Sequence, residues 1–110
     1  MKITTRQADT VLVIEIAGQL DTQNSGEASE RLSEIVKNGH KKVLLNLEEL
    51  EFISSAGLRV ILRTSRALEE QGGHLKVCGA SGLVTEVFVV AGFNILLDLS
   101  ENESAALEDF

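Results

Sequence analysis

Two adjacent serines, Ser54 and Ser55, precede a predicted helix, followed by Ala56 and Gly57 and then by Arg59, four positions after Ser55. A serine at a helix start can act as the N-cap, because its oxygen accepts a backbone N–H of the first turn. A phosphoryl group on the same oxygen would meet unpaired N–H groups and the positive end of the helix dipole. Arg59 would share the helix face of Ser55 and could reach that phosphate. The spacing alone leaves both roles open, a cap and a phosphate acceptor.

Gly57 is a costly residue in the first turn of a helix, since glycine weakens a helix by about 1 kcal/mol relative to alanine. A position without a side chain permits the close approach of another group. We therefore expect another molecule to come close to the chain at this surface.

A serine beside a helix start also occurs in the Gly-x-Ser-x-Gly nucleophile elbow of hydrolases. Here Ile53 occupies the position of the first glycine, and only His40 and His74 could supply a base. Both histidines adjoin lysine or glycine in expected turns, and two isolated histidines with one cysteine do not have the spacing of a metal site. We expect a protein that is not an enzyme and that holds no metal and no cofactor, with a small serine hydrolase as the alternative.

Composition predicts one folded domain over residues 1–110, because 44% of the residues are apolar and 25% are charged. The net charge of −7 has the wrong sign for binding nucleic-acid phosphates, and tryptophan and tyrosine are absent. No apolar run approaches the roughly 20 residues of a membrane span, and the first residues do not resemble a signal peptide. We expect a cytoplasmic protein that contacts neither nucleic acid nor membrane. Cys78 lies in an apolar run, which predicts a buried core thiol.

Branched and apolar runs predict strands at residues 3–7, 11–16, 42–47, 75–78 and 95–97. Apolar stripes predict three helices between them, ending at Asn38-Gly39, Gly72-Gly73 and Gly92, and the Ser-x-x-Glu spacing of Ser100 and Glu103 predicts a short fourth. This alternation predicts an α/β fold with a mixed, mostly parallel sheet of four to five strands and about four helices. The stripes consist of Ala28, Leu32, Ile35 and Val36; of Leu58, Ile61, Leu62, Ser65 and Leu68; and of Val84, Val87, Phe88 and Ala91.

The segment from Leu45 to Leu62 resembles the phosphorylation region of anti-sigma factor antagonists, which belong to the STAS domain family. Gly18-Gln19-Leu20-Asp21 is similar to the family's Gly-x-Leu-Asp element, and Gly72-Gly73 and residues 77–81 and 88–93 are similar to later family segments. The resemblance covers nearly the whole chain and implies a single STAS domain over residues 1–110. In the family, the serine two residues before the glycine is phosphorylated by a partner that is both anti-sigma factor and serine kinase. The resemblance therefore implies phosphorylation of Ser55.

The same resemblance implies a partner-switching cycle. The unphosphorylated protein would bind the anti-sigma factor and release a sigma factor, and a metal-dependent serine phosphatase would restore it after phosphorylation. A phosphoryl group moves the net charge from −7 to about −9 and places a strongly hydrated group in a close contact, so that the partner is released while the fold stays almost unchanged. The expected partner-binding residues are Asp21, Ser54, Ala56, Gly57 and Arg59, on a monomer or weak dimer.

The chain departs from the family pattern on both sides of Ser55. Many members have an aspartate before the phosphorylated serine and a serine or threonine after it, whereas this chain has Ser54 and Ala56. Ser54 is thus a competing phosphate acceptor. Ser55 is favoured over Ser54 because Ser55 stands two residues before Gly57, as the phosphorylated serine of the family does before its glycine. Asp21 matches an aspartate of the family that faces the partner, and a turn acid is its alternative role. A STAS scaffold subunit, which would enter large assemblies, is the alternative to a free-standing switch.

Overall fold

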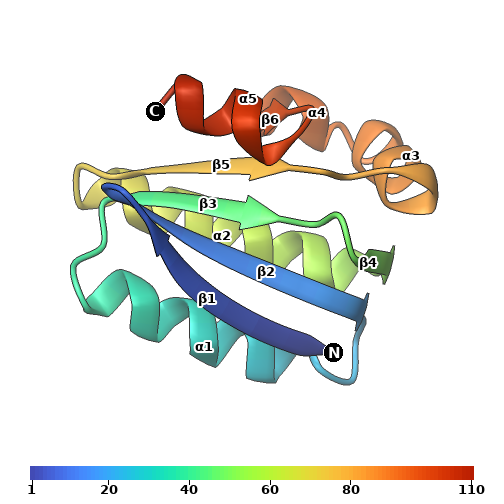
Figure 1. The fold of residues 1–110 in the computed structure, drawn as a ribbon. Coiled ribbons are helices and arrows are strands. Elements are labelled where there is room, and N and C mark those ends of the chain that lie inside the picture. The colour runs from blue at the N-terminus through green and yellow to red at the C-terminus, as the bar shows by residue number, and fades with distance from the viewer.

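A six-stranded mixed sheet forms the centre of the computed structural model, which describes all residues from 1 to 110 (Figure 1). The strands are β1 (Lys2–Ala8), β2 (Val11–Leu20), β3 (Lys42–Asn46), β4 (Leu50–Ile53), β5 (His74–Cys78) and β6 (Asp98–Ser100). The helices are α1 (Ser25–Lys37), α2 (Ser55–Glu70), α3 (Gly82–Val90), α4 (Phe93–Leu96) and α5 (Glu103–Glu108).

The strands follow the order β1-β2-β3-β5-β6, and β4 pairs with the last residues of β2 beyond the end of β3. β1 is antiparallel to β2, and all other pairs are parallel. Parallel strands end at the same edge of a sheet, so the loops after β2, β3, β4 and β5 gather there. We call this side of the molecule the carboxyl-end edge. Asp21, which follows β2, and the two serines that follow β4 lie on it.

Both faces of the sheet are covered, which explains why β2 is an almost continuous apolar run. Leu12, Ile14 and Ile16 belong to the main core, which includes the buried residues of α1 and α2, while Val11 and Val13 belong to a smaller cluster with Ala106 of α5. Cys78 belongs to that smaller cluster, as its predicted role in the core requires. Its burial, and then the nearby carboxylates of Glu103 and Glu48, raise the pKa of the Cys78 thiol to about 11.

The predicted α/β fold is confirmed, and the structure adds two elements, β4 and α4, to those predicted. The last strand was predicted at residues 95–97 and instead spans Asp98–Ser100, because Ile95 lies in α4 with 84% of its surface exposed. Helix α5 does not start from a Ser100 capping box. Asn102 is its N-cap, and the Asn102 Oδ1 atom accepts the backbone N–H of Ala105 at 2.9 Å.

The helical stripes agree with the predicted core faces, apart from the end of α3. Val84 and Phe88 are buried, whereas Ala91 is exposed and forms the cap of α3. The predicted stop at Asn38-Gly39 is confirmed, since Asn38 ends α1 and Gly39 has a φ of +87°, which favours glycine. None of the helices combines the length and the apolar character needed to cross a membrane.

Candidate functional site

The two serines at the start of α2 have different structural roles. Ser54 is the N-cap, with an extended backbone (φ −94°, ψ 171°), and its Oγ accepts the backbone N–H of Gly57 at 3.2 Å. Ser55 is the first residue of the helix, is exposed, and has no hydrogen-bond partner for its hydroxyl. Capping therefore uses Ser54, and the hydroxyl of Ser55 is free for chemistry at the positive end of a helix of 16 residues.

The serine pair is fixed to the end of β2. Ile53 is paired with Leu20, and the Ser54 backbone N–H donates to the Leu20 carbonyl oxygen at 2.9 Å. Asp21 directly follows Leu20, so the structure brings Asp21 and the two serines together on the carboxyl-end edge. The family-like element around Asp21 and the serine segment are thus neighbours in space, although more than thirty residues separate them in the sequence.

Asp21 organises the turn that leads into α1. Its Oδ1 atom accepts the backbone N–H groups of Gln23 at 3.0 Å and Asn24 at 3.1 Å. In return, the Asn24 Oδ1 atom accepts the Asp21 N–H at 2.9 Å, and the Asn24 side-chain amide donates to the Gln19 carbonyl. Of the two roles expected for Asp21, the structure shows the turn acid. The carboxylate also adds negative charge close to the serines.

The absence of a side chain at Gly57 has a cause inside the chain. Gly57 is buried, and a Cβ atom there would lie 2.8 Å from Leu20 Cγ, 2.9 Å from Ile53 Cγ1 and 2.9 Å from the Leu20 carbonyl oxygen. These distances are shorter than carbon atoms tolerate. The expectation that another molecule makes the close approach at Gly57 is therefore corrected: β2 and β4 make it.

Ala56 and Arg59 flank the free serine without being bonded to it. Ala56 is half-buried, and Arg59 is exposed. Arg59 takes no part in the five close pairs of basic and acidic side chains in the structure, whose basic members are Arg6, His74 and Lys76. Its guanidinium is therefore available to an added anion.

Exposed acidic and apolar side chains lie on β4, on the loop before it and on the helix α3, and sequence reasoning missed the apolar ones. Glu48, Glu49 and Glu51 are exposed on β4 and the loop before it. Phe52 on β4 is 39% exposed, and Leu83 on α3, a helix that packs against β4, is 59% exposed. The overlooked signal is the stretch of residues 79–97, which contains a single charged residue, Glu86.

Neither histidine is placed to take a proton from Ser55. His74 begins β5, and the five residues of that strand put about 13 Å between its start and the carboxyl-end edge. The His74 Nε2 atom lies 2.7 Å from Asp98 Oδ2. His40 precedes the start of β3, on the same side as His74. No group of three or more metal-ligating side chains converges in the structure.

Sequence comparison finds relatives that match over nearly their whole length. BtrV of Bordetella bronchiseptica, which carries the name of a proposed anti-sigma factor antagonist, is 33% identical over 110 residues, which cover 100% of this chain and 95% of BtrV. The anti-sigma F factor antagonist of Paenibacillus polymyxa is 27% identical over 100 residues, with 90% and 86% of the two chains covered.

Solved structures share the fold at low sequence identity. An anti-sigma factor antagonist from Mycobacterium paratuberculosis superposes with a TM-score of 0.90 at 18% identity, covering 98% of this chain and 92% of the other. The Bacillus cell fate determinant SpoIIAA, in its phosphorylated form, has a TM-score of 0.73 at 22% identity, and 98% of each chain is covered. The family model of the STAS domain matches residues 2–106. With nearly every residue of the sheet and its helices inside that match, the chain belongs to the STAS domain family.

Proposed function

We propose that this chain is an anti-sigma factor antagonist that binds an anti-sigma factor with serine kinase activity, and that phosphorylation of Ser55 ends the binding. The observation that carries the proposal is the division of roles at the start of α2. Ser54 holds the helix by its bond to Gly57, and Ser55 presents an exposed, unbonded hydroxyl one residue later. A kinase can thus modify Ser55 without breaking a bond of the fold.

The start of α2 is suited to a phosphate electrostatically. The first N–H groups of a helix have no partner within the helix, and Ser54 Oγ satisfies only that of Gly57. The first turn contains no acidic side chain to repel a phosphate, and Arg59 stands one turn further on. Phosphorylation in this place leaves the fold intact, since helix dipole and anion attract each other.

Release of the partner follows from charge and hydration. A phosphoryl group adds about two negative charges to the carboxyl-end edge, where Asp21 follows β2 and the exposed Glu48 and Glu49 follow β3. A partner that fits against this edge must then strip water from a dianion, which costs binding free energy unless the partner offers new cations. The acidic surface, in contrast, attracts a partner with a basic face as long as Ser55 is unmodified.

The relatives support both states of the switch. Several are named anti-sigma factor antagonists, and SpoIIAA has been solved in an unphosphorylated and in a phosphorylated form. In the proposed cycle a serine phosphatase regenerates the free hydroxyl, and the chain acts in the cytoplasm as a monomer or weak dimer. It binds and releases its partner and catalyses no reaction itself.

The test is phosphorylation by the serine-kinase-like proteins of its own organism with ATP, followed by mapping of the phosphate by mass spectrometry. Ser55→Ala is expected to abolish labelling and to retain binding to the kinase, whereas Ser55→Asp weakens binding. Ser54→Ala is the matched control and is expected to remain a substrate. Labelling that persists in Ser55→Ala and disappears in Ser54→Ala would assign the acceptor to Ser54 and refute the proposed site.

A scaffold subunit is the second candidate, favoured by the apolar surface of α3 and α4. Leu83, Val89 and Val90 on α3 and Ile95 and Leu96 on α4 are each more than half exposed. Apolar surface of this extent is often covered by another protein. Light scattering during size-exclusion chromatography separates the two candidates, because a switch protein elutes as a monomer or weak dimer and a scaffold subunit as a large assembly.

A further inference from the structure

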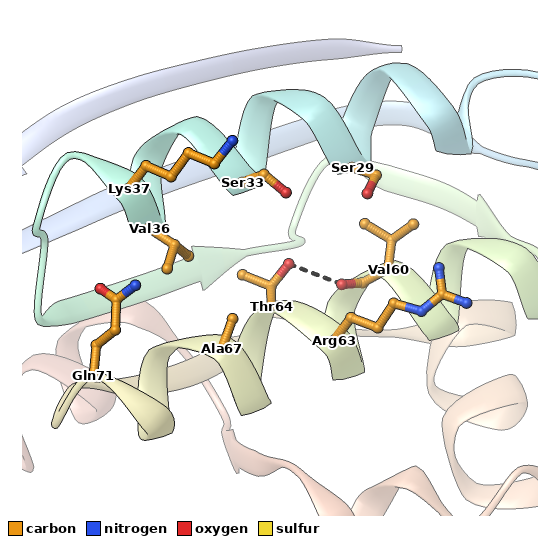
Figure 2. A pocket seen from close by; sticks show the side chains of 9 residues that line it. All are labelled: Ser29, Ser33, Val36, Lys37, Val60, Arg63, Thr64, Ala67 and Gln71. Carbon is orange, nitrogen blue, oxygen red and sulfur yellow. Dashed lines mark hydrogen bonds between the residues drawn. The ribbon is translucent and has the colours of Figure 1, made fainter.

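A groove lies between α1 and α2, on the side of these helices that faces away from the sheet (Figure 2). It has a volume of about 300 Å³ and follows α2 from Val60 to Gln71. Val36, Val60 and Ala67 give it an apolar floor. The hydroxyl groups of Ser29 and Ser33 point from α1 toward α2, so that the wall on that side offers hydrogen-bond donors and acceptors.

The groove is positively charged in a chain whose net charge is −7. Lys37 of α1 and Arg63 of α2 line it, and no carboxylate does. Neither cation takes part in any of the five close pairs of basic and acidic side chains. Glu30 and Glu34 line an adjoining depression on α1, which shares Ser29, Ser33 and Lys37 with the groove. Neither cation of the groove is therefore held in an ion pair by a carboxylate of the chain.

Arg63 belongs to a row of three arginines on α2, of which it alone lines the groove. Arg59, Arg63 and Arg66 follow the i, i+4, i+7 spacing of one helix face, and all three are exposed. None of them forms an ion pair. From Arg59 to Arg66 the helix rises about 10 Å. A single small anion would engage only part of such a row, whereas an elongated anionic ligand can engage all of it.

We propose that this groove binds an extended acidic peptide segment of a partner protein. The stretch from Val60 to Gln71 rises about 16 Å, a length that about five residues of extended chain cover. In an extended chain alternate side chains point to opposite sides, so apolar residues lie on the floor while the acidic ones between them face the long side chains of the arginine row. The site lies along the flank of α2, and Ser55 is not among the residues that line it.

The probe is the peptide acetyl-Glu-Leu-Glu-Leu-Glu-Leu-amide, titrated into the full-length ¹⁵N-labelled protein. We expect saturable changes of backbone amide shifts that centre on Ser33, Lys37, Arg63 and Thr64, with an affinity that falls as salt is added. The uncharged peptide acetyl-Gln-Leu-Gln-Leu-Gln-Leu-amide is expected to bind at least about tenfold more weakly, because it cannot form the ion pairs.

Variants assign the binding to the groove. The double substitution Lys37→Gln and Arg63→Gln is expected to weaken binding of the acidic peptide about three- to tenfold, as expected for two exposed ion pairs. Arg31→Gln on the outer side of α1 removes the same kind of charge and should leave the affinity unchanged. All these residues are exposed, so an unchanged melting temperature verifies the fold of each variant.

Four results would overturn the proposal. The first is an equal loss of affinity in Arg31→Gln, and the second is equal binding of the uncharged peptide. The third is tighter binding of inorganic phosphate to the same amides, which would make the groove a site for small anions. Absence of any saturable shift with the acidic peptide counts equally against it. Each of these outcomes leaves the proposal for Ser55 untouched, because no kinase takes part in the titration.

Discussion

Gly57 and Leu20 lie so close that a Cβ atom on Gly57 would come within 2.8 Å of Leu20 Cγ. The pairing of β4 with the end of β2 brings these distant residues together. The backbone hydrogen bond from Ser54 N–H to the Leu20 carbonyl, 2.9 Å long, fixes the same junction. The first turn of α2, which carries Ser55, is thus anchored to the sheet by packing and by hydrogen bonding.

Gly57→Ala is therefore expected to destabilise the protein, even though alanine favours helices. Overpacking at a buried backbone contact typically costs about 1–3 kcal/mol, which exceeds the gain in helix propensity of about 1 kcal/mol. Urea unfolding followed by circular dichroism measures the difference. Gly26→Ala is the matched control, since a Cβ atom at that position of α1 has nothing within 4 Å, and it should be neutral or stabilising. Equal effects of the two substitutions would contradict the packing explanation.

Substitutions of the two serines should have different effects on the free energy of unfolding. Ser54→Ala removes the N-cap bond to Gly57 and is expected to lower the free energy of unfolding by about 1 kcal/mol. Ser55→Ala removes an exposed, unbonded hydroxyl, and its free energy of unfolding should stay within about 0.5 kcal/mol of that of the unchanged protein. Chemical unfolding of both variants under the same conditions decides the matter. A larger loss in Ser55→Ala than in Ser54→Ala would reverse the assignment of the cap.

Phosphorylation of Ser55 should change amide shifts near the modified residue and leave the rest of the sheet unaffected. The expected region is the first turn of α2 together with the neighbouring Leu20 and Asp21, because the phosphate acts on the N–H groups at the helix start. Two-dimensional ¹⁵N spectra of the modified and unmodified protein give the comparison. Large shifts throughout β3 and β5 would indicate a rearranged fold and contradict a switch that acts by local charge.

Asp98 makes stability depend on acid pH. Burial raises the pKa of Asp98, but hydrogen bonds from His74 and Lys76 outweigh burial and hold the pKa below the ordinary value of 3.8. Because the pKa of Asp98 is depressed in the folded state, its ionised carboxylate stabilises the fold above pH 3.8. This stabilisation is lost as the pH falls through the lower pKa that Asp98 has in the folded protein.

Asp98→Asn should accordingly be less stable than the unchanged protein at neutral pH, and the difference should shrink below about pH 4. Urea unfolding between neutral and strongly acid pH measures both curves. Glu86→Gln is the control, because Glu86 is exposed on α3 and takes part in no ion pair. Its free energy of unfolding should change with pH in the same way as that of the unchanged protein. If the difference in free energy of unfolding between Asp98→Asn and the unchanged protein stays constant down to strongly acid pH, the ion pairs of Asp98 do not cause it.

Cys78 should be almost unreactive in the folded protein. The thiol is buried under α5, and its pKa is raised to about 11, so that little thiolate exists near neutral pH. Iodoacetamide at pH 8 is expected to label the protein slowly, and labelling should speed up strongly in unfolding concentrations of urea. Mass spectrometry of timed samples gives both rates. Labelling of the folded protein at the rate of free cysteine would show that the cluster under α5 opens readily.

The sequence by itself determined most of the elements, because their signals are local. The run from Val11 to Ile16 predicts a strand buried on both faces, and the apolar stripe from Leu58 to Leu68 predicts α2 with its buried side. The serines before that stripe had to lie at a helix start. Where local signals are weak, prediction failed: β4 has only four residues and a register shift in its pairing with β2, and α4 has four residues as well.

Only the tertiary structure decided which serine caps the helix and why Gly57 is a glycine. Both serines satisfy the local rule for an N-cap, and the choice of Ser54 depends on backbone angles that the pairing of β4 with β2 imposes. The neighbours of Gly57 include Leu20, which no local pattern connects with it. Contacts between distant residues follow from the register of strands, and that register is set by the packing of the whole sheet. The free hydroxyl of Ser55 is therefore a property of the folded chain, although the residue itself stands out in the sequence.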